Sequence, residues 1–130
     1  MITTGPLFTE THTLRQADFN LFAGISGDNN PIHVDPAFSA RTRFGRTVSH
    51  GMLLYSVLWG LMRRHLPPGR QTAQTLMFPA PAFADEPLVF SASVLRADRD
   101  ATDLALKVVR AGDGETVCDA TATLRHGEAA

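Results

Sequence analysis

The sequence predicts an α+β fold in which a curved antiparallel sheet of about five strands wraps around one long helix. Residues 49–65, SHGMLLYSVLWGLMRRH, are apolar on nearly all sides until the last turn, which is typical of a buried helix. Strand-like runs lie near 8–12 and at roughly 72–79, 87–97, 103–110 and 115–125. A sheet wrapped around the helix is the simplest way to bury both.

Size and charge limit the function classes. A chain of 130 residues and 14.1 kDa fits a single domain over residues 1–130. Its net charge of -1 argues against a nucleic-acid partner. One cysteine, Cys118, excludes an intramolecular disulfide and a cysteine zinc cluster. Without a targeting motif or a stretch long enough to cross a bilayer, we expect a cytoplasmic protein with no membrane partner.

Local signals define the remaining elements. Thr13 and Gln16 predict a capping box that begins a helix, and Gly27 is well suited to end it. Within it, Ala17, Leu21 and Ile25 recur at near-helical spacing. Residues 27–49 predict a long irregular connection with one turn after Asp35-Pro36. Alternation predicts two buried strand faces, formed by Leu88, Phe90, Ala92 and Val94 and by Cys118, Ala120, Ala122 and Leu124.

The central helix also predicts self-association. A single five-stranded sheet leaves one face of a helix that is apolar on all sides uncovered. A second copy of the chain is the simplest cover for that face, so we expect a homodimer.

A carboxylate and an imidazole stand five residues apart at Asp28 and His33, in the sequence DNNPIH. Pro31 biases Asn30 to an extended conformation, so the loop can aim both side chains at one point. Such a pair can take one proton and give another near neutral pH, as the addition of water to an activated double bond requires. The step needs no metal, and the pair is a poor zinc site. By spacing alone, ordinary turn chemistry explains these residues equally well.

The longer pattern around this pair is more specific. Phe22, the run Ile25-Ser26-Gly27-Asp28, the run Asn30-Pro31-Ile32-His33 and Ser39 resemble the signature of the MaoC-like, R-specific enoyl-CoA hydratases. The resemblance continues through SHGMLL at 49–54 and FPAPAFADEP at 78–87. It implies a hot-dog fold and hydration of trans-2-enoyl thioesters to (3R)-3-hydroxyacyl thioesters, or the reverse dehydration. Asp28 and His33 would be the catalytic pair, and no cofactor is implied.

The resemblance also implies an oxyanion donor at Gly51, where the free N–H groups of a helix start can polarise a thioester carbonyl. Without it, a glycine that lets the loop approach the helix is the simpler explanation. We further expect substrate contacts from Asn30 in the loop and from three neighbours of Gly51, namely Ser49, His50 and Met52.

Two more residues bear on the substrate. Arg43, in ARTRFGR beside Arg41 and Arg46, can meet the phosphates of coenzyme A, although such arginines are usually only solvated. Trp59 falls where some relatives carry a small polar residue near the acyl pocket, so we expect it to favour short acyl chains unless it only fills core volume.

Three functions remain in competition. The first is the hydratase or dehydratase, the second a hot-dog thioesterase that uses the same helix end, and the third a non-catalytic subunit that binds acyl thioesters. The sequence leaves open whether the carrier is coenzyme A or acyl carrier protein, and which of Asp28 and His33 is the base.

Overall fold

The computed structural model of the chain describes residues 2–127. Its elements, in chain order, are β1 (Gly5–Thr13), α1 (Gln16–Ser26), α2 (Pro31–Val34), α3 (Pro36–Ala40), α4 (Gly51–His65), β2 (Gly69–Met77), β3 (Pro87–Ala97), β4 (Ala101–Arg110) and β5 (Thr116–His126). Five strands and one long helix confirm the predicted α+β class. The second strand begins three residues earlier than its composition predicts, because Gly69 and Arg70 already pair with β5.

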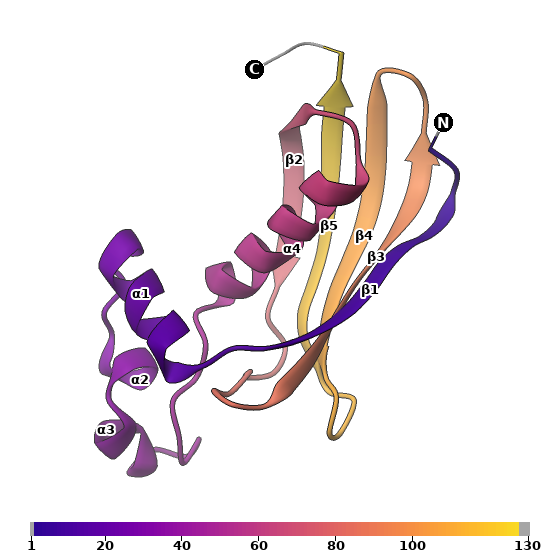
Figure 1. Cartoon of the computed structure of the whole chain (residues 1–130). Helices are drawn as coiled ribbons and strands as arrows, with labels where there is room; N and C mark the ends of the chain where they lie inside the picture. Colours follow the sequence, from indigo (N-terminus) through magenta and orange to yellow (C-terminus); the bar gives the residue numbers. More distant parts are fainter. Residues whose placement is uncertain (1, 128–130) are drawn as a thin grey trace.

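The strands form one antiparallel sheet in the order β1-β3-β4-β5-β2. Figure 1 shows the sheet curving around α4, while α1, α2 and α3 gather beyond the N-terminal end of that helix. Contacts of α4 with β1, β3 and β5 place the helix across the middle of the sheet. This is the predicted hot-dog arrangement, and it leaves β1 and β2 as the two edges.

The core lies between α4 and the concave face of the sheet. The predicted alternation is confirmed, because Leu88, Phe90, Ala92 and Val94 on β3 and Cys118, Ala120, Ala122 and Leu124 on β5 are all buried. From α4, Leu58 and Met62 are fully buried, and burial of such a side chain stabilises a fold by about 1.5–3 kcal/mol. Burial also raises the pKa of the Cys118 thiol to about 11, as expected of an unreactive core cysteine.

One side of α4 is not covered by the residues that the structure describes, 2–127. Met52 is 44% exposed, and Ser56 and Gly60 are exposed on later turns. The helix is therefore buried on one broad face, and its other side is free for a ligand or a second copy.

The predicted cap of the first helix is wrong. The helix begins at Gln16, and the backbone N–H of Arg15 bonds to the Asp18 carboxylate, so Thr13 and Gln16 do not form its cap. The apolar stripe also faces outward, since Leu21 is 65% and Ile25 76% exposed. The buried positions are Phe19 and Ala23, because the helix packs beside the end of α4 and not against the sheet.

The connection from α1 to α4 is more ordered than predicted. Gly27 ends α1 with a left-handed φ of 82°, as expected. Asn30 and Asp35 then cap two short helices, α2 and α3, each of which starts with a proline. The Val48 N–H donates a hydrogen bond of 3.0 Å to the Ile32 carbonyl, which brings the end of the segment back to α2. The segment therefore forms a closed loop beside α4. Among residues 2–127, no helix is long and apolar enough to cross a membrane.

Candidate active site

His33 is held from two sides in the loop before α4. Its Nδ1 donates a hydrogen bond to the Val48 carbonyl at 2.6 Å, and its own backbone carbonyl accepts one from the Gln16 side chain at 2.8 Å. A carbonyl only accepts, so Nδ1 carries the proton and Nε2 of the neutral ring keeps a lone pair. The side chain is 14% exposed, so the ring is fixed while Nε2 remains available for proton transfer.

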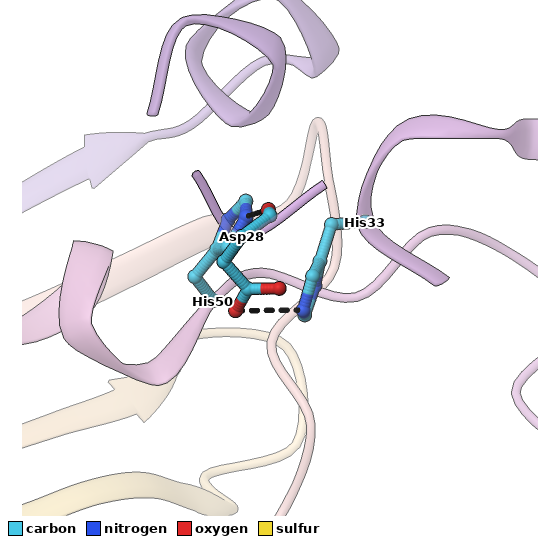
Figure 2. A group of neighbouring side chains, drawn as sticks. All are labelled: Asp28, His33 and His50. Carbon is cyan, nitrogen blue, oxygen red and sulfur yellow. Dashed lines mark hydrogen bonds and ion pairs between the residues drawn. The ribbon is translucent and has the colours of Figure 1, made fainter. Parts of the chain in front are cut away.

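Asp28 provides the carboxylate opposite that nitrogen. Its Oδ2 lies 3.8 Å from Nε2 of His33, and its side chain is 56% exposed. Figure 2 shows the two side chains directed toward one another. A separation of 3.8 Å is too long for a direct hydrogen bond but suits a single water that contacts both groups. The loop therefore brings together the carboxylate and the imidazole that the sequence paired.

A third titratable residue, His50, completes the cluster. Its ring stacks on that of His33 with centroids 3.9 Å apart and planes 24° apart, and its Nε2 donates to the Asp28 carbonyl at 2.8 Å. One potential ligand atom from each of Asp28, His33 and His50 lies within 4.8 Å of the others. Nearly parallel rings direct their lone pairs along separate planes, which is a poor arrangement for two histidines that bind one ion. The geometry is better suited to proton transfer than to metal binding.

The N-terminus of α4 adjoins this cluster through Gly51, the first residue of the helix. Within the described residues, the N-cap His50 makes no side-chain bond to the first turn of the helix, whose N–H groups also lack partners within it. A Cβ on Gly51 would lie 2.7 Å from the Phe78 ring. A side chain at position 51 would therefore displace the Phe78 ring, and glycine avoids that clash.

Two hollows flank the start of α4. The first, of about 290 Å³, is lined by Arg43, Ser49, Gly51 and Phe78 among others. The second, of about 450 Å³, lies between α4 and β2 and is lined by Met52, Tyr55, Ser56, Trp59 and Arg63 with residues of β2. Met52 and Trp59 therefore lie on the same face of the helix, on the wall of the second hollow.

Other predicted site residues make local contacts. Asn30 accepts the Ile32 N–H as the cap of α2, and the Ser49 hydroxyl donates to the His50 carbonyl at 3.0 Å. Of the three loop arginines, Arg46 is paired with Glu86, whereas Arg43 faces the hollow beside Gly51. Arg43 is thus the one that the structure brings to the site.

Three contributors escape prediction from sequence. Gln16, assigned above to a helix cap, holds the His33 carbonyl and also accepts from the Thr47 hydroxyl. Val48 acts through its backbone carbonyl, which has no sequence signature. Phe78 packs on Gly51, and its place in the segment that resembles the hydratase family is the one signal that marks it.

Comparison with known proteins identifies the family. A model described as MaoC like domain matches residues 1–117. An (R)-specific enoyl-CoA hydratase from Aeromonas caviae is 38% identical over 101 residues, which cover 74% of this chain and 75% of that protein. A 3-hydroxybutyryl-CoA dehydratase from Methylorubrum extorquens is 44% identical over 62 residues, which cover 46% of this chain and 40% of that protein.

Solved structures agree. The structure described as the (R)-hydratase from A. caviae involved in PHA biosynthesis superposes with a TM-score of 0.89 at 31% identity, covering 97% of this chain and 98% of that one. The family model, the 38% identical relative and this superposition all span most of the sequence, and the chain belongs to the family of MaoC-like domain proteins.

Proposed function

We propose that this protein catalyses the R-specific hydration of trans-2-enoyl thioesters to (3R)-3-hydroxyacyl thioesters, or the reverse dehydration. The observation that carries the proposal is the pair formed by Asp28 Oδ2 and His33 Nε2, 3.8 Å apart beside the start of α4. The relatives named as a hydratase and a dehydratase support the same reaction in its two directions.

The pair provides the proton transfers that hydration requires. One group takes a proton from water as the water oxygen attacks C3, and the other group gives a proton to C2. The two groups together must hold one proton before the reaction. Each turnover moves that proton from one group to the other, and 3.8 Å is short enough for a single water to return it. The roles of base and acid are assigned to the pair, and not to one residue each.

The start of α4 is the proposed electrophilic element. Negative charge develops on the thioester oxygen as water adds, and the Gly51 N–H and the positive end of the helix dipole would stabilise it. Loss of one such donor in an enzyme typically reduces kcat by ~10²–10³-fold. In this proposal the thioester carbonyl lies at Gly51, and Arg43 on the wall of the first hollow attracts the phosphates of the carrier, coenzyme A or acyl carrier protein. The acyl tail extends along α4 into the second hollow, which Trp59 lines.

We also propose that the protein acts as a homodimer without a cofactor or a nucleic-acid partner. The uncovered side of α4, the edge strand β2, and the exposed Met77 and Phe78 at the end of that strand support self-association. The cytoplasmic location and the roles of Asn30, Ser49 and Met52 in substrate binding stay predictions.

The reaction type is tested with crotonyl-CoA and purified protein. We expect loss of the enoyl absorbance while the thioester stays intact, and chiral chromatography should give the 3R product. Release of free thiol would instead identify a thioesterase. Absence of both changes would favour a non-catalytic binding subunit, and a 3S product would contradict the proposed stereochemistry.

The roles of the pair are tested by Asp28→Asn and His33→Ala. Each change should lower kcat by at least ~10²-fold, the usual scale for loss of a positioned acid or base, with an unchanged circular dichroism spectrum. His12→Ala is the matched control, because it replaces a half-exposed histidine on β1, and it should keep wild-type turnover. Near-wild-type activity in either folded pair variant would contradict the assignment.

Chain-length preference is tested at Trp59. This residue lies eight positions after Gly51, roughly 12 Å along the helix, where its indole would block a long acyl tail but not a crotonyl group. Trp59→Ala should raise kcat/KM for six- to eight-carbon enoyl thioesters relative to crotonyl by about tenfold. Trp59→Phe should shift the profile less.

Only variants that melt cooperatively are informative, because truncation of a packed tryptophan costs ~3–5 kcal/mol. If a folded Trp59→Ala variant keeps the wild-type profile, the indole fills core volume and does not limit the acyl chain.

Self-association is tested by light scattering at micromolar concentration, where we expect about twice the chain mass of 14.1 kDa. Met77→Asp should shift the protein toward monomer, because it places like charges across the proposed interface. Leu95→Asp, a change at an exposed apolar position on β3, should leave the mass unchanged. A monomeric wild type, or dissociation by Leu95→Asp alone, would contradict an interface at the β2 edge.

A further inference from the structure

His50 is the most deeply enclosed side chain of the cluster, with an exposed fraction of 2%. Its ring is surrounded by other rings, with centroid distances of 3.9 Å to His33, 4.9 Å to Phe22 and 6.4 Å to Phe19. A side chain with so little open surface offers little area to a substrate, although the sequence predicts a substrate contact at His50. Its position therefore calls for another role.

The polar contact of His50 identifies that role. Nε2 donates a hydrogen bond of 2.8 Å to the backbone carbonyl of Asp28, so the neutral ring carries its proton on Nε2 and a lone pair on Nδ1. Nδ1 is buried and has no hydrogen-bond partner among the described residues. A buried nitrogen without a partner costs free energy, so this ring is retained here at a cost. Among the described residues, the side-chain hydrogen bond that the ring does make is the one to the Asp28 carbonyl.

That bond anchors the segment that carries the carboxylate. The neighbouring hydrogen bonds are local, from the Asp28 N–H to the Ser26 hydroxyl and from the Asn29 N–H to the Gly27 carbonyl. The bond from His50 spans 22 residues and ties the Asp28 backbone to the N-cap of α4. Figure 2 shows His50 reaching the Asp28 backbone while its ring lies beside His33.

We propose that His50 is a positioning residue that sets the distance between the Asp28 carboxylate and His33 and holds both next to Gly51. This inference rests on the hydratase function proposed above. The Nε2–H of His50 fixes the Asp28 backbone, and its stacked ring fixes the plane of His33. Gly51, whose N–H is the proposed oxyanion donor, follows His50 directly in the chain. One side chain thereby joins three parts of the site that come from different segments.

Two substitutions separate the donor from the ring. His50→Phe keeps an aromatic ring for stacking but removes the donor to Asp28, and His50→Gln keeps an N–H donor but removes the ring. A displacement of about 1 Å in a reacting group can cost ~10²-fold in rate, so His50→Phe should lower kcat at least about tenfold. KM should change by less than about twofold, because His50 does not contact substrate. His50→Gln should retain kcat within about threefold.

A double-mutant cycle distinguishes positioning from a general structural role. If His50 acts through Asp28, His50→Phe should lower kcat by less than about threefold once Asp28→Asn is present. His65→Phe is the matched control, since His65 also stacks on an aromatic ring, that of Phe8 at 5.2 Å, but at the other end of α4. It should leave kcat unchanged in both backgrounds. Equal losses from His50→Phe in both backgrounds, or an equal loss from His50→Gln, would overturn the proposal.

A measurement on the unmodified protein decides the matter if His50→Phe does not fold. Nitrogen-15 NMR in mildly alkaline buffer should show opposite tautomers for the two stacked rings, Nε2–H for His50 and Nδ1–H for His33. An Nδ1–H tautomer at His50 would remove the bond to Asp28 and overturn the proposal. If the wild type lacks hydratase activity, the proposed function fails, and the tautomers still test the anchoring bond by themselves.

Discussion

The hydrogen bond from His33 Nδ1 to the Val48 carbonyl is the contact on which the site depends. Together with the bond from the Val48 N–H to the Ile32 carbonyl, it closes the segment between α1 and α4 onto itself. Closure brings a histidine of that segment to the residues just before α4, and it directs the proton of the neutral ring to Nδ1. Without it, the ring could flip within the plane set by its stacking on His50, and the nitrogen that faces Asp28 would not be defined.

The hot-dog fold supplies the rigid element to which this segment is attached. Leu58 and Met62 anchor α4 in the sheet, so the helix N-terminus has a fixed place and direction. At that end the Phe78 ring lies directly against Gly51. The chemistry proposed here uses groups from the loop and from the helix end, and the core keeps the two in register. The Asp28 side chain is exposed to solvent, but its backbone carbonyl is bound by the buried His50. The carboxylate is therefore both accessible and held in position.

Much of the fold could be predicted because its signals are periodic and strong. The long apolar run at 49–65 and the alternation in 87–97 and 115–125 identify elements whose burial the structure confirms. The first helix shows where such signals fail, since Leu21 and Ile25 repeat correctly but face solvent. Its predicted cap failed because Gln16 bonds to His33 and Thr47, a tertiary contact that overrides a local motif.

The site could be predicted in part for similar reasons. Asp28 and His33 are close in sequence and match a family pattern, so their pairing was accessible. The contact of His50 with Asp28 crosses 22 residues, and no spacing rule predicts it. The carbonyl of Val48 is equally hidden, because backbone groups are the same at every residue. The contacts that hold the site together therefore come mostly from groups that are far apart in the sequence. Only the folded chain reveals them.

A stereochemical measurement tests most directly whether Asp28 and His33 act from one side of the substrate. Hydration of crotonyl-CoA in deuterium oxide places a deuteron on C2 and a hydroxyl on C3, and NMR of the isolated product gives their relative configuration. Because the two groups lie 3.8 Å apart, both parts of the water should add to the same face, which gives a single syn diastereomer. The anti diastereomer, or an equal mixture of the two, would show that this pair does not perform both proton transfers.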